Sequence, residues 1–157
     1  MNHTLREYIM LPNSRIVLLL EKIKEYCTEL EEVPLTFHEY DDDVKSRRFI
    51  ERTLQIAIES CFDIFHQIVK DKNIGICSND ENMIQKLVTA KIISVDLGNK
   101  LKEMKKFRNV LVHRYVEIEN EKVFYHATHN ITDLEQFQTE VLAYLKKDKG
   151  GSVRVKK

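Results

Sequence analysis

Glycine and proline, the residues that most often interrupt regular structure, are scarce in this sequence. Its 157 residues include four glycines and two prolines, whereas Leu, Ile, Glu and Lys, which favour helices, are plentiful. The length suits one domain that can bury a hydrophobic core. The composition therefore predicts a single all-α domain.

Net charge and long apolar runs are also missing. Twenty-five Lys and Arg balance twenty-five Asp and Glu, so no global field attracts the chain to nucleic acid or to a membrane. No apolar run approaches the roughly 18 residues that a membrane-spanning helix needs, and the N-terminus lacks the apolar stretch of a signal peptide. We expect a soluble, cytoplasmic protein with no membrane partner.

Motifs for metals, phosphates and disulfides are absent as well. Cys27, Cys61 and Cys77 are odd in number and widely spaced, which favours free thiols in a reducing compartment. No glycine-rich phosphate loop occurs. His126 and His129 lie three residues apart, but no cysteine or acidic residue accompanies them in their segment. We therefore expect neither a metal nor another cofactor.

Apolar periodicity predicts an antiparallel bundle of about five helices in one domain, residues 1–145. We expect loops at 34–43 and around Gly75, an irregular segment at 116–130 with an extended stretch at 123–125, and a disordered basic tail at 146–157. A capping box at Thr132 and Glu135 marks the start of the last helix. The expected helices are Ser14–Glu32, Val44–Asp71, Glu81–Ile93, Val95–Val116 and Thr132–Leu145.

The expected second helix is apolar around most of its circumference. Such a helix is either central in its own bundle or shared with a second subunit, and we favour one that also lines a dimer interface. A single polar line follows it, formed by Arg52, Gln55, Glu59 and Asp63. This line is either a solvated strip or a row of partners for a charge across the bundle.

That charge is Arg108, near the end of the expected fourth helix. Burying an unpaired arginine costs several kcal/mol, so we expect a counter-charge, either Glu59 or Asp63. His113, whose residue type titrates near neutral pH, follows five residues later. Arg108 replaces one apolar member of a stripe with helical spacing: Leu97, Leu101, Met104, Leu111 and Tyr115.

Helix geometry limits how these residues can cooperate. At about 100° per residue, Arg108 and Tyr115 lie within roughly 20° of each other, and Asn109 and His113 within about 40°. Arg108 and His113 are about 140° apart. Lysines and arginines at 100, 102, 105, 106, 108 and 114 surround one acid, Glu103, which predicts a local basic surface able to attract phosphate.

A purely structural interpretation is open for each residue. Arg108 would pair with an acid of the second helix, His113 would interact with the dipole at its helix C-terminus, and Tyr115 would belong to the core. The alternative is a functional site on the same stretch of chain.

The stretch Arg108-Asn109-Val110-Leu111-Val112-His113-Arg114-Tyr115 resembles the Arg-x4-His-x-Tyr signature of the HEPN superfamily. In particular, it is similar to HepT-like toxins that are paired with minimal nucleotidyltransferase antitoxins. The expected second helix, RRFIERTLQIAIESCFDIFHQIV, is also similar to the corresponding helix of that family. The similarity extends from about residue 15 to residue 146.

The resemblance implies a homodimeric helical bundle whose two motifs face each other across a cleft. It further implies a metal-independent endoribonuclease, in which His113 transfers protons, Arg108 stabilises charge on the phosphorus and Asn109 orients the site. Tyr115 is the position at which the antitoxin would attach AMP. RNA and the cognate nucleotidyltransferase are thus the expected partners.

Two other functions stay open. A non-catalytic HEPN module could bind a nucleotidyltransferase or nucleotides without cutting RNA, and the zero net charge fits it better. The chain could also be a plain structural dimer. Cleavage of RNA without added metal distinguishes the first of the three possibilities from the others.

Overall fold

The computed structural model describes residues 14–33, 36–113 and 119–155. Within these ranges the backbone forms six helices and no strand, which confirms the prediction of an all-α domain. The helices are α2 (Ser14–Glu31), α3 (Phe37–Asp42), α4 (Val44–Asp71), α5 (Asp80–Thr89), α6 (Val95–Val112) and α7 (Asn120–Val155).

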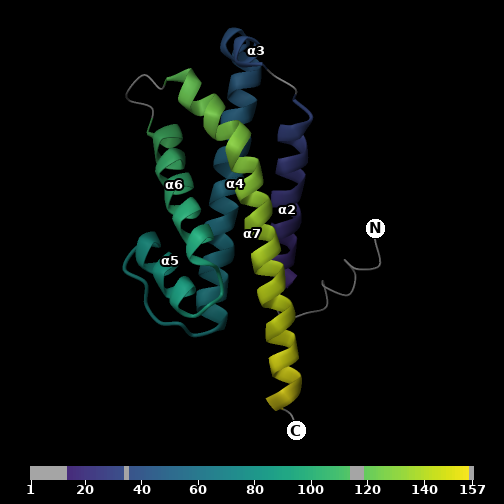
Figure 1. Ribbon diagram of the computed structural model, residues 1–157, viewed down its shortest axis with the longest axis vertical. Helices are drawn as coiled ribbons and strands as arrows, with labels where there is room; N and C mark the ends of the chain where they lie inside the picture. Colours follow the sequence, from purple (N-terminus) through teal and green to yellow (C-terminus); the bar gives the residue numbers. More distant parts are fainter. Residues whose placement is uncertain (1–13, 34–35, 114–118, 156–157) are drawn as a thin grey trace.

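Four long helices, α2, α4, α6 and α7, run along the long axis of the molecule, with α2 and α6 opposite in direction to α4 and α7 (Figure 1). Helix α2 packs against α4 and α7, and α6 packs against α4, α5 and α7. The short helices α3 and α5 lie at opposite ends of the bundle (Figure 1). Among the described residues, no helix is both long and apolar enough to cross a membrane.

Helix α4 is the centre of the bundle. Asp43 caps it by accepting a hydrogen bond from the Lys45 backbone N–H at 3.1 Å, and α2, α6 and α7 cover its apolar sides. Leu54, Ile58 and Phe65 are fully buried within the single chain. Packing inside one chain therefore accounts for most of the apolar circumference that we attributed in part to a dimer interface.

Aromatic packing explains two helical segments that the sequence analysis assigned to loops. The Phe124 ring, on α7, lies 5.8 Å from Phe37 and 5.5 Å from Tyr40, both on α3. Thr36 and Glu39 form a capping box that starts α3. The predictions of a loop at 34–43 and of an extended stretch at 123–125 were thus wrong at residues 37–42 and 123–125.

Helix α7 is one continuous helix from Asn120 to Val155. The predicted start at Thr132 is wrong, because that residue lies in the helix interior. The backbone of residues 146–155, which we expected to be disordered, is also helical. An ion pair between Lys72, at the end of α4, and Asp148 holds this last part of α7 against the bundle.

Helices α5 and α6 approach each other closely. Gly98 makes this possible, because a Cβ atom there would lie 2.9 Å from Cγ2 of Val88. Helix α5 ends at Thr89, earlier than predicted, and α6 ends at Val112 rather than Val116. Ser94 caps α6 as predicted, accepting a hydrogen bond from the Leu97 N–H at 3.1 Å.

Candidate functional site

The buried stripe of α6 has no gap at position 108. Phe107, only 6% exposed, fills the place between Met104 and Leu111. Arg108 follows at the edge of this stripe, where 32% of its side chain is exposed. Its guanidinium therefore both reaches water and has a partner, so the large cost of a buried unpaired charge does not arise.

Glu59, on α4, is that partner. Its Oε1 accepts hydrogen bonds from Nε of Arg108 at 3.1 Å and from Nη2 at 2.8 Å. The same oxygen accepts a third bond from Nε2 of Gln55 at 3.1 Å. Of the two possibilities left open for the polar line along α4, the contacts of Glu59 match a partner for Arg108.

Burial alone would raise the pKa of the Glu59 carboxyl. Hydrogen bonds from Gln55 and Arg108, together with the positive charges of Arg108 and Arg52, outweigh burial and lower the pKa below its ordinary value. Asp63, the other candidate, lies one turn further along α4, where it is exposed. Among the described residues it forms no ion pair with Arg108.

Asn109 and His113 lie on the other side of α6. Oδ1 of Asn109 accepts a hydrogen bond from Nη1 of Arg108 at 3.2 Å, so its amide N–H groups stay available as donors. His113 is the C-cap residue of α6, where its backbone N–H donates to the Asn109 carbonyl at 2.9 Å and its side chain is exposed. Tyr115 lies outside the described residues.

Arg108 and His113 line two different pockets. Arg108 lines a pocket of about 300 Å³ between α4, α5 and α6, together with Glu59 and Asp63. His113 and Asn109 line a pocket of about 610 Å³ between α6 and the start of α7. The structure of one chain therefore keeps the wide angular separation that the helical geometry predicts.

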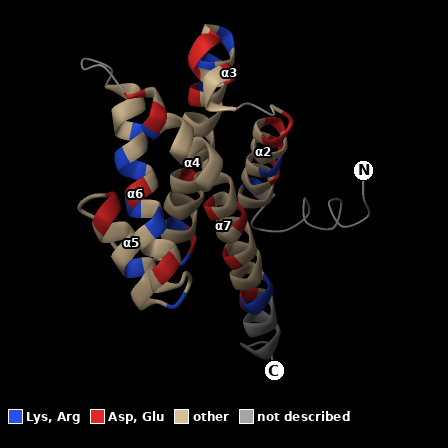
Figure 2. Ribbon diagram, turned by 45° about the horizontal axis from the view of Figure 1, so that its top comes forward, with Lys and Arg blue, Asp and Glu red and all other residues tan. Residues whose placement is uncertain are grey.

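The basic surface predicted along α6 is largely neutralised by acids of α6 itself and of neighbouring helices. Figure 2 shows Lys and Arg along α6, and Asp and Glu on the neighbouring α5 and α7. Lys105 pairs with Asp80 of α5, and Nζ of Lys100 lies 3.0 Å from Asp96 and 3.8 Å from Asp133 of α7. Any attraction of phosphate here is consequently weaker than the sequence suggests.

His126 is a site residue that the sequence analysis missed. We placed it in an irregular segment, but it lies on α7 and lines the same pocket as His113. Its ring stacks on Phe107, with 4.4 Å between ring centroids and 21° between the planes. The available signal was a buried stripe with helical spacing: Val123, Ala127, Asn130, Leu134 and Phe137.

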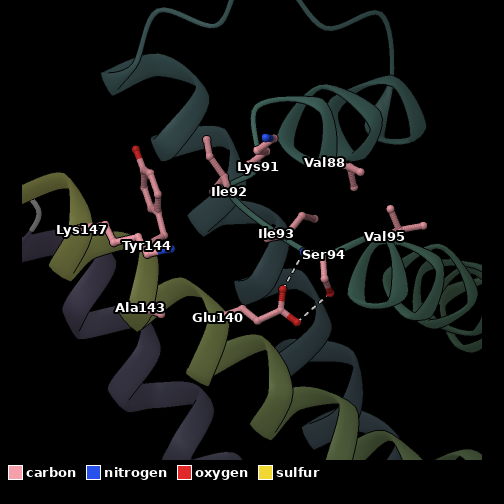
Figure 3. A pocket seen from close by; sticks show the side chains of 10 residues that line it. All are labelled: Val88, Lys91, Ile92, Ile93, Ser94, Val95, Glu140, Ala143, Tyr144 and Lys147. Carbon is pink, nitrogen blue, oxygen red and sulfur yellow. Dashed lines mark hydrogen bonds between the residues drawn. The ribbon is translucent and has the colours of Figure 1, made fainter. Parts of the chain in front are cut away.

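A third pocket, of about 530 Å³, lies near the start of α6 between the α5–α6 connection and α7. Figure 3 shows that its acidic residue, Glu140, points at Ser94. Glu140 accepts hydrogen bonds from the Ser94 N–H at 2.6 Å and from its hydroxyl at 2.9 Å. These bonds attach the start of α6 to α7, so this carboxylate has a structural role.

The described residues contain no group of three His, Cys, Asp or Glu side chains that could hold a metal ion. His126 and His129 do not form a pair, because the His129 ring stacks instead on Tyr125 at 3.9 Å. Two of the acids near Arg108 pair with cations: Glu59 with Arg108, and Asp80 with Lys105.

Comparison with known proteins identifies the class to which this fold and site belong. The HepT-like ribonuclease family matches residues 23–141, which is most of the chain. The chain therefore belongs to the HepT-like ribonuclease family. It is 26% identical over 125 residues to the mRNA nuclease HepT of Shewanella oneidensis, a match that covers 80% of this chain and 94% of that protein.

Solved structures agree with this assignment. The tri-AMPylated HEPN toxin of Shewanella oneidensis, in complex with its MNT antitoxin, matches with a TM-score of 0.75 and 26% identity, over 82% of this chain and 96% of that one. The cytosolic protein YutE of Bacillus subtilis matches with a TM-score of 0.75 and 16% identity, over 88% and 93%. The second likeness shows the fold alone.

Proposed function

We propose that this chain is the endoribonuclease toxin of a toxin–antitoxin pair, and that His113 and Arg108 carry the reaction. The observation that supports the proposal most strongly is the complete motif at the end of α6, with Arg108 fixed by Glu59 and His113 exposed beside a pocket. Membership of the HepT-like ribonuclease family and the likeness to the Shewanella toxin give independent support.

In this mechanism the 2′-hydroxyl of the RNA attacks the adjacent phosphorus. His113 accepts the hydroxyl proton as a general base, and the 5′-oxygen of the next nucleotide leaves with a proton supplied by water, so that a cyclic phosphate forms. Arg108 stabilises the charge that develops on the phosphoryl oxygens. These two residues supply proton transfer and charge stabilisation, so the proposed reaction needs no metal ion.

The contacts of Arg108 suit this role. A guanidinium has five N–H donors, and three of them are bonded, two to Glu59 and one to Asn109. The two remaining N–H groups can meet a phosphate. Glu59 and Asn109 thereby act on the reaction through Arg108, because they hold its guanidinium plane.

The active unit in this proposal is a homodimer. Arg108 and His113 of one chain face different pockets, separated by the body of α6. A second copy related by twofold symmetry would place the two motifs across one cleft, as the family resemblance implies, and would bring the Arg108 of one chain towards the His113 of the other. Phe49, on α4, and Val112, on α6, are exposed apolar residues that such an interface would cover.

The proposed antitoxin is a minimal nucleotidyltransferase that attaches AMP to Tyr115. Tyr115 follows His113 by two residues in the sequence, so a bulky anionic group there would block RNA. Coexpression with a candidate minimal nucleotidyltransferase should add AMP to the wild type, detected by intact-protein mass spectrometry, and leave Tyr115→Phe unmodified. Modification of Tyr115→Phe at the wild-type level would contradict the assignment.

Purified protein incubated with RNA in the presence of a metal chelator tests the activity. We expect the wild type to cleave RNA and to arrest growth when overexpressed. His113→Ala should lower the cleavage rate by about 10²–10⁴-fold, as expected for removal of a general base, and Arg108→Ala by about 10²–10³-fold. Equal cleavage by the wild type and both variants would refute the assigned roles.

A non-catalytic module that binds a nucleotidyltransferase is the second candidate. The zero net charge and the paired lysines of α6 favour it, because an RNA-cutting enzyme gains affinity from free cations. Such a module would copurify with the nucleotidyltransferase and leave RNA intact in the chelator experiment.

A further inference from the structure

The pocket between α6 and α7 is lined by apolar side chains and by polar side chains that carry hydrogen-bond donors and acceptors. Its deepest residues are Phe107 and Val123, which are 6% and 0% exposed, and Val110 lines it as well. Polar groups with donors and acceptors, Asn109 and His126, stand beside these apolar side chains. The volume of about 610 Å³ falls within the range of small-molecule and nucleotide sites.

The charges around this pocket cancel. Nζ of Lys106 lies 2.8 Å from Glu103, and Nζ of Lys122 lies 3.0 Å from Glu119. The described residues that line this pocket thus present no excess of positive charge to a phosphate. A neutral, flat group with apolar faces and polar edges matches it better than an anion does.

The His126 ring forms one wall of the pocket. Phe107 supports one of its faces at a centroid distance of 4.4 Å, and the Tyr125 ring packs nearly perpendicular to it, 83° between planes. The ring is half-buried, so part of it is open to a ligand. Burial lowers the pKa of His126 and outweighs the hydrogen bond with Asn130, which raises it.

We propose that this pocket binds one nucleobase of single-stranded RNA, stacked on His126, next to the phosphate at which His113 acts. The inference rests on the proposed ribonuclease function and adds a substrate subsite to it. Stacking on aromatic side chains is a general way of holding unpaired bases, and every base offers a flat face for it. Stacking on His126 therefore favours strands with unpaired bases. It adds no ionic contact to the RNA backbone.

The test compares His126→Leu, which removes the ring at similar bulk, with His126→Phe, which keeps a flat ring. His38→Leu is the matched control, because His38 is an exposed histidine on α3, outside the pocket. The probes are 12-nucleotide deoxy strands of A, C or T, which lack the attacking hydroxyl, and an abasic strand of equal length. Fluorescence anisotropy gives the Kd, and circular dichroism checks that each variant is folded.

The wild type, His126→Phe and His38→Leu should bind base-containing strands about tenfold tighter than the abasic strand. His126→Leu should lose this preference, with an unchanged slope of log Kd against log salt, because no charge has been removed. With RNA, His126→Leu should raise KM about tenfold and leave kcat close to the wild-type value.

Two results would overturn the nucleobase subsite: equal binding of abasic and base-containing strands by the wild type, or a full base preference in folded His126→Leu. Failure of the ribonuclease proposal looks different. In that case the strands still show the base preference through His126, while RNA incubated with the wild type stays intact.

Discussion

The two sides of helix α6 present different kinds of interaction: directed hydrogen bonds on one side and ring stacking beside a pocket on the other. On the α4 side, Arg108 is fixed by directed bonds from its guanidinium to Glu59 and Asn109. On the α7 side, His113 stands exposed at the helix end beside a pocket supported by the stacked rings of Phe107 and His126. One side orients a charge, and the other leaves room for a flat ligand next to a titratable group.

This difference indicates how the motif works. An ion pair that is one-third exposed adds little stability, so the pairing of Arg108 with Glu59 is better understood as orientation of a guanidinium. In the proposed dimer a second copy of the chain brings Arg108 and His113 together, because helix α6 separates them within one chain.

Replacing Phe107 with alanine should have the largest effect on stability. Phe107 is almost fully buried in the α6 stripe, and removing such a ring leaves a cavity that costs about 3–5 kcal/mol. Denaturant unfolding followed by circular dichroism measures this change. Val110→Ala, at a half-exposed position on the same helix, should change the free energy of unfolding by less than about 0.5 kcal/mol. Similar losses in both variants would contradict the packing described for the α7 side.

Glu59→Ala tests orientation on the α4 side. Without its carboxylate, Arg108 loses two of its three bonds, and a misplaced guanidinium should lower kcat about tenfold or more. Asp63→Ala is the matched control, because Asp63 is on the same helix and lines the same pocket. It should retain kcat within about twofold, since surface substitutions away from such contacts have small effects. If both variants lose activity equally, charge in the pocket matters and the specific pairing does not.

The smallest effect concerns pH. The pKa of Glu59 is lowered in the folded protein, so its contribution to stability is present above its unfolded pKa and is lost as the pH falls through the lowered value. The Tm of the wild type should therefore exceed that of Glu59→Gln at neutral pH, and this difference should shrink as the pH falls below the ordinary range of a glutamate carboxyl. A difference that stays constant as the pH is lowered would show that ionisation of Glu59 is irrelevant.

Much of this arrangement could be predicted from the sequence. The bounds of α4, Val44 and Asp71, follow from a capping aspartate and a long apolar pattern, and both were predicted correctly. A counter-charge for Arg108 was expected at Glu59 or Asp63 because an unpaired arginine on an apolar stripe is costly, and the structure shows Glu59 in contact with it. Such inferences succeed where one helix carries a periodic signal of its own.

The failures come from contacts between segments. Asn130 is buried but polar, so it interrupts the apolar stripe of α7. The apolar pattern in the sequence therefore marked this helix only after Asn130. Helix α3 has six residues, too few for a periodic signal, and it depends on packing against Phe124. His126 could not be assigned to the pocket because the helix that carries it was not predicted at that position. Phe107 was overlooked because the helical spacing of the stripe placed Arg108 between Met104 and Leu111.

The central claim is that Arg108 of one chain and His113 of another form one active site. Coexpressing Arg108→Ala and His113→Ala chains with different tags, and purifying the doubly tagged species, tests it most directly. Each variant alone should be almost inactive, whereas the mixed dimer should hold one intact site of two and cleave RNA at about half the wild-type rate. A mixed dimer as inactive as either parent, or no mixed dimer at all, would contradict the claim.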